Sequence, residues 1–89
     1  MTVVHRLVGY DRRSDRMKAG CDIPPDRLAE AKRIAGVAPD DPDAAWSYPL
    51  SATKAHAIAQ LIGTDIDPDQ LEFFLEPFAD PAAGGGIRP

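Results

Sequence analysis

The segment near the start of the chain is rich in residues that favour β-strands. In the segment "VVHRLVGY" the apolar positions fall on both sides of an extended backbone, with Val3 and Leu7 on one side and Val4, Val8 and Tyr10 on the other. Apolar side chains on both sides are typical of a strand inside a sheet rather than at its edge. We therefore predict a strand that is covered on both faces or lies in the centre of a sheet.

A second alternating segment follows after the polar stretch "DRRSDR". In "MKAGCDI" the side chains of Met17, Ala19, Cys21 and Ile23 point one way, and the residues between them point the other way. The polar stretch is of the kind that forms turns. The two segments together predict a β-hairpin.

Two further segments have the period of an amphipathic helix. The first, "PPDRLAEAKRIAGV", starts with prolines, ends at Gly36 and carries an apolar stripe made of Leu28, Ala31, Ile34 and Ala35. The second, "ATKAHAIAQLI", follows Ser51 as a capping residue, ends at Gly63 and carries a stripe made of Ala55, Ile58, Ala59 and Ile62. Both are predicted helices.

The segment between these helices is acidic and then aromatic. "APDDPDAA" has no period and predicts a loop, and "WSYPL" predicts a short return strand. Pro49 keeps Tyr48 away from helical backbone angles. We expect Tyr48 to be packed against the core and Trp46 either to close the edge of the core or to be exposed.

A third helix is predicted over "PDQLEFFLE". Asp67 is in place as its cap, Pro68 is its first residue, and Pro77 is expected to end it at Glu76. Its core face would consist of Leu71, Phe74, Leu75 and Phe78. The predicted fold is α+β in the order ββαβαα, a small antiparallel sheet packed by three helices on one face. Residues 1–80 form its single domain and residues 81–89 a flexible tail.

Composition bounds the class of protein. The chain has 89 residues and one cysteine, Cys21, so we expect one domain without an internal disulfide, in the cytoplasm. We expect no leader peptide, and no apolar run approaches the roughly 20 residues of a membrane span. Residues 1–33 carry eight basic side chains and five acidic ones, whereas residues 34–89 carry two basic and nine acidic ones. This asymmetry is able to steer a partner, although it is also typical of a solvated surface.

The chemistry-bearing residues do not form a readable catalytic or metal site. Asp65, Asp67, Asp69 and Glu76 have the spacing of four calcium ligands in an EF-hand loop, but Gln70 replaces the glycine that such a loop needs for its turn. Cys21 lies in an apolar alternation and fits a packed thiol better than a nucleophile. His5 and His56 are isolated. We expect no metal, no cofactor and no enzyme activity.

A basic turn also has two interpretations. Arg12, Arg13, Arg16 and Lys18 suit phosphate contacts, but Asp11 and Asp15 lie among them and the chain carries a net charge of −4. Nucleic-acid-binding domains usually have a clear basic excess. We expect no nucleic-acid partner.

Several segments together resemble a family of small bacterial proteins that carry a domain of unknown function. "YDRRSDR" is similar to that family's Tyr/Phe-Asp start of the first turn, "DDPDAAWSYPL" to its acidic "DDPM-x-x-x-YP-[VI]" segment, and "LEFFLE" to its closing "[YF]-[DE]-[YF]-F-L-E" block. Leu50 and Phe73 depart mildly from the usual residues. The resemblance implies a fold and a bacterial cytoplasmic origin, and it implies no reaction.

The function predicted from the sequence is a non-enzymatic domain that binds another protein. Its candidate contact surface is the set of acidic and aromatic residues Asp40, Asp41, Asp43, Trp46, Asp69, Glu72 and Glu76. A narrower version is an immunity-type inhibitor that covers a basic toxin. An alternative class is a small-molecule-binding protein or enzyme with a pocket near Trp46, Tyr48 and His56.

Overall fold

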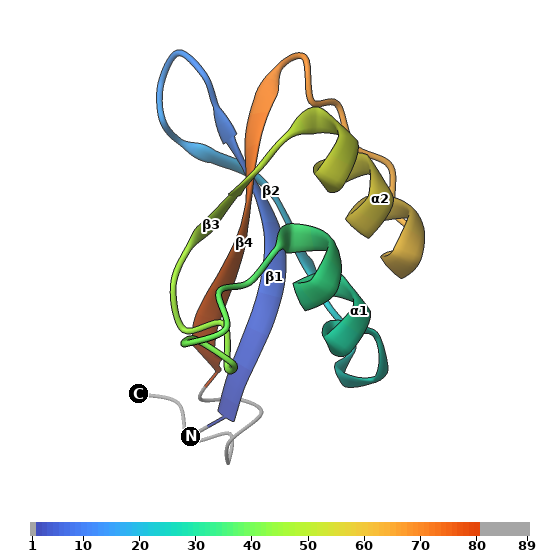
Figure 1. Ribbon diagram of the computed structural model, residues 1–89. Helices are drawn as coiled ribbons and strands as arrows, with labels where there is room; N and C mark the ends of the chain where they lie inside the picture. Colours follow the sequence, from blue (N-terminus) through green and yellow to red (C-terminus); the bar gives the residue numbers. More distant parts are fainter. Residues whose placement is uncertain (1, 81–89) are drawn as a thin grey trace.

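A four-stranded antiparallel sheet and two helices packed on one of its faces make up the fold (Figure 1). The computed structural model describes residues 2–80, so the predicted tail, residues 81–89, lies outside the described residues. The strand order is β2-β1-β4-β3. The elements are β1 (Thr2–Asp11), β2 (Met17–Asp22), α1 (Pro25–Ala35), β3 (Tyr48–Leu50), α2 (Ala52–Ile62) and β4 (Leu71–Asp80). The α+β class is confirmed.

The predicted N-terminal hairpin is confirmed, with one change in which side chains face the core. β1 pairs with β2, and the register shifts between Gly9 and Tyr10, so that Gly9 pairs with Ala19 and Tyr10 pairs with Met17. The extra residue of this irregularity is Lys18, and it moves Met17 to the opposite side of the sheet from Ala19. Met17 is consequently 46% exposed, where simple alternation predicted a core position.

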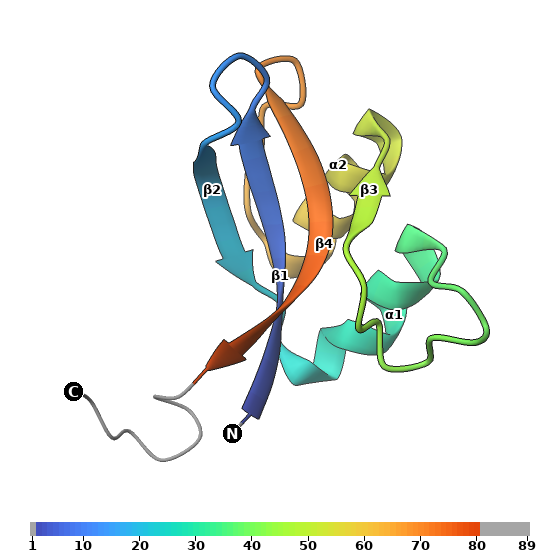
Figure 2. The ribbon, with the colours of Figure 1, turned by 90° about the vertical axis from the view of Figure 1, so that its left-hand side faces the viewer.

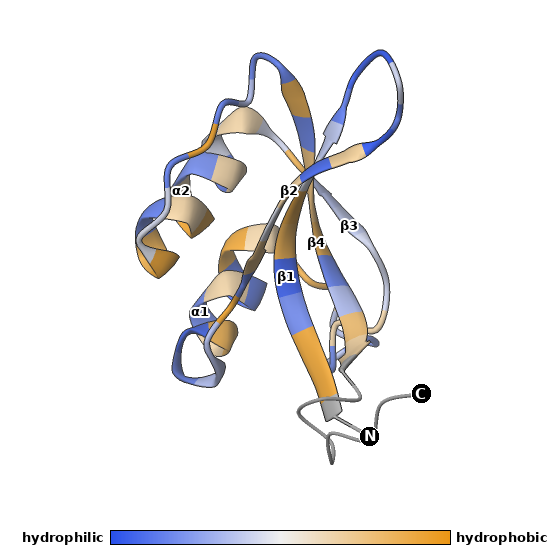
Figure 3. Ribbon diagram, turned by 180° about the vertical axis from the view of Figure 1, so that it is seen from behind, coloured by the Kyte–Doolittle hydropathy of each residue, from blue (hydrophilic) through white to orange (hydrophobic). Residues whose placement is uncertain are grey.

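The helices α1 and α2 form where the residues at their ends predicted them. α1 starts with Pro25 and ends at Gly36, which has a φ of 75°. The Ser51 side chain accepts a hydrogen bond of 3.2 Å from the Lys54 amide at the start of α2, and Gly63 ends that helix with a φ of 75°. Hydrophobic and hydrophilic residues alternate along both helices in Figure 3, as amphipathic helices require.

The third predicted helix is wrong, because its segment forms the long strand β4. β4 pairs with β1 along its whole length, from Leu71 opposite Asp11 to Asp80 opposite Thr2. The sequence "LEFFLEPF" satisfies both periods: Leu71, Phe74, Leu75 and Phe78 have helical spacing, but Leu71, Phe73 and Leu75 also alternate. Pro77, expected to end a helix, lies where β4 has no β3 partner, since β3 pairs only with Phe73–Leu75. A proline is tolerated at such an edge. The observed order is therefore ββαβαβ.

The hydrophobic core lies between the helices and one face of the sheet. β1 and β4 contribute Leu7, Phe73 and Leu75, and the helices contribute small residues and Ile58. Ala31 and Ala55 are fully enclosed, so the helices approach the sheet closely. Within residues 2–80, no helix lies over the opposite face of the sheet, as Figures 1 and 2 show. We call this uncovered surface the open face, formed in the two central strands by Val4, Arg6, Val8, Tyr10, Glu72, Phe74, Glu76 and Phe78.

Candidate functional site

The acidic aromatic loop is organised around one buried carboxylate. Asp41 is only 6% exposed. Its Oδ1 accepts a hydrogen bond of 2.9 Å from the Ala45 amide, and its Oδ2 accepts one of 2.6 Å from the Tyr48 hydroxyl and one of 3.3 Å from the Trp46 amide. The sequence predicted Asp41 as part of a contact surface. The structure instead turns this carboxylate inward and bonds it to neighbouring residues of the chain.

These bonds also set the protonation of both partners. Burial acts to raise the pKa of Asp41, but the hydrogen bonds from Tyr48 and from the two amides outweigh it, so the pKa of this carboxyl is lowered. The hydrogen bond to Asp41 in turn raises the pKa of the Tyr48 phenol above 10.0, its ordinary value. Tyr48 is half-buried against the core, as predicted. The loop thus reaches β3 through a charge-assisted hydrogen bond.

The other residues of this loop do reach the surface. Asp40 and Asp43 are exposed, and Trp46 is 70% exposed. The sequence predicted that Trp46 either closes the edge of the core or is exposed, and in the structure its side chain is exposed. An indole this exposed gains little from burial in the free protein. The loop therefore presents one large aromatic side chain close in sequence to two acidic ones.

Of the three acidic residues in the third predicted helix, two lie on the strand that replaces it and one lies outside that strand. Glu72 and Glu76 lie on the open face of β4, and Asp69 lies in the turn before this strand. Glu76 accepts hydrogen bonds of 3.0 Å from the Tyr10 hydroxyl and 2.9 Å from the Ser47 hydroxyl. The Ser47 contact ties the loop that carries Trp46 to the open face.

The open face carries aromatic side chains that sequence reasoning assigned to the core. Phe74 packs edge-on against Tyr10, with ring centroids 5.6 Å apart and an interplanar angle of 77°. The Arg6 guanidinium lies 4.9 Å from the centre of the Phe78 ring and donates a hydrogen bond of 2.7 Å to Asp22. Burial is the largest cause that raises the pKa of Tyr10, followed by its hydrogen bond to Glu76. If "LEFFLEPF" is taken as a strand with strict alternation, Phe74 and Phe78 fall on the side opposite to Phe73 and Leu75, and this pattern was the available sequence signal.

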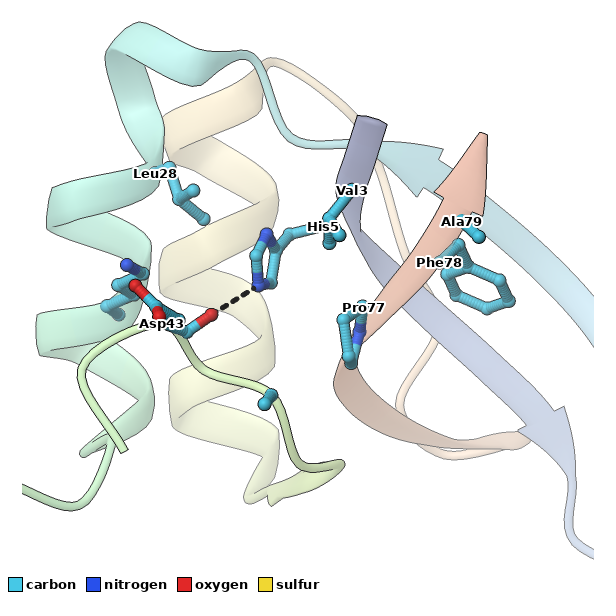
Figure 4. A pocket seen from close by; sticks show the side chains of 9 residues that line it. Val3, His5, Leu28, Asp43, Pro77, Phe78 and Ala79 are labelled. Atoms are coloured by element: carbon cyan, nitrogen blue, oxygen red, sulfur yellow. Dashed lines mark hydrogen bonds between the residues drawn. The ribbon is translucent and has the colours of Figure 1, made fainter. Parts of the chain in front are cut away.

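A pocket of about 660 Å³ opens between α1, the ends of β1 and β4, and the loop before β3 (Figure 4). It is lined by Val3, His5, Leu28, Lys32, Asp43, Ala45, Pro77, Phe78 and Ala79. Trp46, Tyr48 and His56, near which the sequence placed an alternative ligand pocket, do not line this one. His5, set aside as an isolated residue, is buried in its wall, and its Nε2 lies 3.1 Å from the carbonyl oxygens of both Asp43 and Ala44.

The remaining chemistry-bearing residues do not assemble into a site. Cys21 is half-buried and its Sγ lies 3.6 Å from the Thr64 hydroxyl. Within residues 2–80, no group of three or more His, Cys, Asp or Glu side chains is arranged to hold a metal ion. The Asp67 side chain accepts the Asp69 amide at 3.1 Å and so supports the turn before β4. None of the helices described here is long and apolar enough to cross a membrane.

The fold and these surfaces define a small two-layer α+β domain with one covered and one uncovered sheet face. Residues 5–76 match the model of the family described as Domain of unknown function (DUF7683), and the chain belongs to this family. The match begins within β1, covers β2, both helices and β3, and ends within β4. Neither a curated protein nor a solved structure matched the chain.

Proposed function

We propose that this domain acts by binding another protein, through the open face of the sheet together with Trp46. One observation carries the proposal: half-buried aromatic side chains remain on a sheet face that no helix covers. Phe74 and Phe78 each keep part of their apolar surface in contact with water, and Trp46 keeps most of it. Apolar surface left exposed among polar residues is typical of interaction sites when it forms a patch.

The loop and the face act as one surface in this proposal. Ser47 bonds to Glu76 on the open face, and Trp46 is the residue directly before Ser47. The backbone of Trp46 is therefore one residue away from a contact with the open face. Aromatic side chains, tryptophan above all, supply much of the energy of protein interfaces when a partner buries them. Trp46 is the anchor residue of the proposed surface.

Charge at this rim favours a partner with a basic surface. Asp40 and Asp43 are exposed in the same loop as Trp46, whereas the carboxylate of Asp41 is bonded internally. Complementary charge at an interface rim mainly accelerates encounter and rejects wrong partners. An inhibitor of the immunity type, which covers a basic toxin, is the narrower form of this proposal. It predicts a partner whose enzyme activity falls when the domain binds.

Site-specific photo-crosslinking in the native cells tests the proposal. A photoreactive phenylalanine analogue is placed singly at Trp46 and at Phe78, and at Gln60 on the exposed side of α2 as the control. We expect Trp46 and Phe78 to capture the same protein and Gln60 not to capture it. Capture of the same set of proteins at all three positions, or of none at Trp46 and Phe78, would contradict the proposal.

The basic nature of the partner is tested separately. Replacing Asp40 and Asp43 together by Lys reverses the rim charge without touching the bonds of Asp41. We expect the crosslink from Phe78 to the captured protein to weaken in this variant, and more so at low salt than at high salt. An unchanged crosslink at both salt concentrations would contradict the proposal that the partner is basic, but it would not contradict the interaction itself.

A further inference from the structure

The pocket beside His5 has the composition of a small-molecule site. Its volume of about 660 Å³ falls within the range of roughly 300–1,000 Å³ that is common for ligand pockets. Its walls are mainly apolar, with Val3 and Pro77 from the two central strands and Leu28 from α1. Three polar side chains, His5, Lys32 and Asp43, interrupt these walls. A few polar groups in a mainly apolar pocket fix the orientation of a ligand.

The hydrogen bonds of His5 leave one defined atom for a ligand. Both neighbours of Nε2 are carbonyl oxygens, those of Asp43 and Ala44, and carbonyl oxygens only accept hydrogen bonds. The ring proton is therefore assigned to Nε2, and in the neutral ring Nδ1 keeps a free lone pair. Among residues 2–80 no group donates to Nδ1, and every fully enclosed side-chain nitrogen or oxygen has a partner. Nδ1 is thus an acceptor that is not fully enclosed and has no donor among these residues.

Figure 4 shows how the ring lies between the two sides of the pocket. One ring nitrogen points to the Asp43 carbonyl and the other points away from it, with Leu28 on one side and Val3 and Phe78 on the other. His5 is 7% exposed and its ring is held by the two carbonyls, so the orientation of the ring is fixed before any ligand arrives. A preorganised acceptor loses little entropy on binding.

The charges at the wall favour an uncharged ligand. Lys32 supplies one positive charge, and its ammonium donates a hydrogen bond of 2.8 Å to the Pro42 carbonyl. Asp43 supplies one negative charge on the neighbouring loop. The two charges have opposite signs, so their combined field gives little net electrostatic attraction to a bound anion or cation.

We propose that this pocket binds a small, uncharged, largely apolar molecule that donates an O–H or N–H group to Nδ1 of His5. Phenols and alcohols with a short hydrocarbon part have this chemistry. A molecule of the same shape without the donor would remove water from Nδ1 and give no hydrogen bond in return, which costs binding free energy. The site shares Asp43 and Phe78 with the protein-binding surface proposed above, but its chemistry rests on His5 and does not depend on a protein partner.

The test compares 4-propylphenol with 4-propylanisole, which has a methyl ether in place of the phenol O–H. Amide and histidine-ring nitrogen spectra are recorded during titration of the whole chain with each compound. We expect 4-propylphenol to shift the Val3 and Leu28 amides and the Nδ1 signal of His5, and to bind about tenfold more tightly than 4-propylanisole, the loss of one hydrogen bond. His56, exposed on α2, serves as the internal control and should not shift.

Two variants separate the hydrogen bond from the pocket. His5→Gln keeps an N–H group to donate to the two carbonyls but offers no ring acceptor, so we expect the preference for the phenol to disappear. Ala45→Leu fills part of the pocket from an exposed position, so we expect both compounds to bind more weakly. Equal affinity of the wild-type chain for the two compounds, or no shift at His5 up to the solubility limit, overturns the proposal. Both of these outcomes are measured on the wild-type chain, so misfolding of His5→Gln cannot mask them.

Discussion

The hydroxyl of Tyr48 donates a hydrogen bond of 2.6 Å to Oδ2 of Asp41, which lies seven residues earlier in the chain. This contact joins the acidic loop to the short strand β3 and turns the Asp41 carboxylate away from solvent. It explains why three neighbouring aspartates behave differently. Asp41 stabilises the loop, whereas Asp40 and Asp43 remain exposed.

We predict that Asp41→Asn lowers stability at neutral pH and flattens its dependence on acid. The folded protein lowers the pKa of Asp41 below 3.8, its ordinary value, so the folded state binds a proton less readily than the unfolded chain. The resulting stability is fully present above the ordinary pKa and is lost as the pH falls through the lowered one. Asn cannot titrate and offers the loop fewer acceptors.

Denaturant unfolding from pH 7 down to pH 2 measures this difference. Asp40→Asn is the matched control, because Asp40 is exposed in the same loop. The acid dependence that Asp11 and Glu30 contribute, whose pKa values are also lowered by hydrogen bonds, should remain in both variants. Parallel stability curves for the wild type and Asp41→Asn between pH 5 and pH 2 would exclude this role for Asp41.

Gly9→Ala should destabilise the sheet, whereas Gly20→Ala should not. A Cβ atom at Gly9 would lie 2.8 Å from Cε1 of Phe73, its buried cross-strand neighbour, and 3.1 Å from Leu71 Cδ1. Overpacking of this kind costs about 1–3 kcal/mol. A Cβ atom at Gly20 meets its nearest neighbour, the Met17 sulfur, only at 3.8 Å. The measurement is the free energy of unfolding of each variant. An equal loss of stability in both would show that close packing against Phe73 is not the reason for the loss in Gly9→Ala.

Phe73 and Phe74 are adjacent, and truncating them should have unequal effects. Phe73 is 2% exposed within the core, so Phe73→Ala should cost about 3–5 kcal/mol. Phe74 is half-buried on the open face, and Phe74→Ala should cost roughly 1–2 kcal/mol. Chemical denaturation gives both values. Were this segment a helix with Phe74 on its core face, as the sequence pattern first predicted, the order of the two losses would be reversed.

Trp46 should report a water-exposed environment in the free protein. Its side chain is 70% exposed, so we expect an emission maximum near that of tryptophan in water and efficient quenching by iodide or acrylamide. Trp46→Ser should change the free energy of unfolding by less than about 0.5 kcal/mol, because its amide, not its indole, bonds to Asp41. A blue-shifted emission maximum, or a large loss of stability in Trp46→Ser, would indicate a packing role instead.

Local signals in the sequence determined the elements whose ends are set by neighbouring residues. Proline at the start and glycine at the end define α1, and Ser51 and Gly63 define α2. These signals act within one turn of helix, so they do not depend on the rest of the fold. The alternation of the first two strands was equally readable, except where the irregularity at Gly9 and Tyr10 displaced Met17.

Tertiary structure decided the elements and side chains whose partners lie far away in the chain. "LEFFLEPF" fits a helix and a strand alike, and only pairing with β1, whose residues lie at least 60 positions earlier, selects the strand. That choice moves Phe74 and Phe78 from the predicted core to the open face. His5 became part of a pocket because the loop carbonyls that hold it are 38 and 39 residues away. Sequence patterns report which side of an element is apolar, but long-range contacts determine what that side meets.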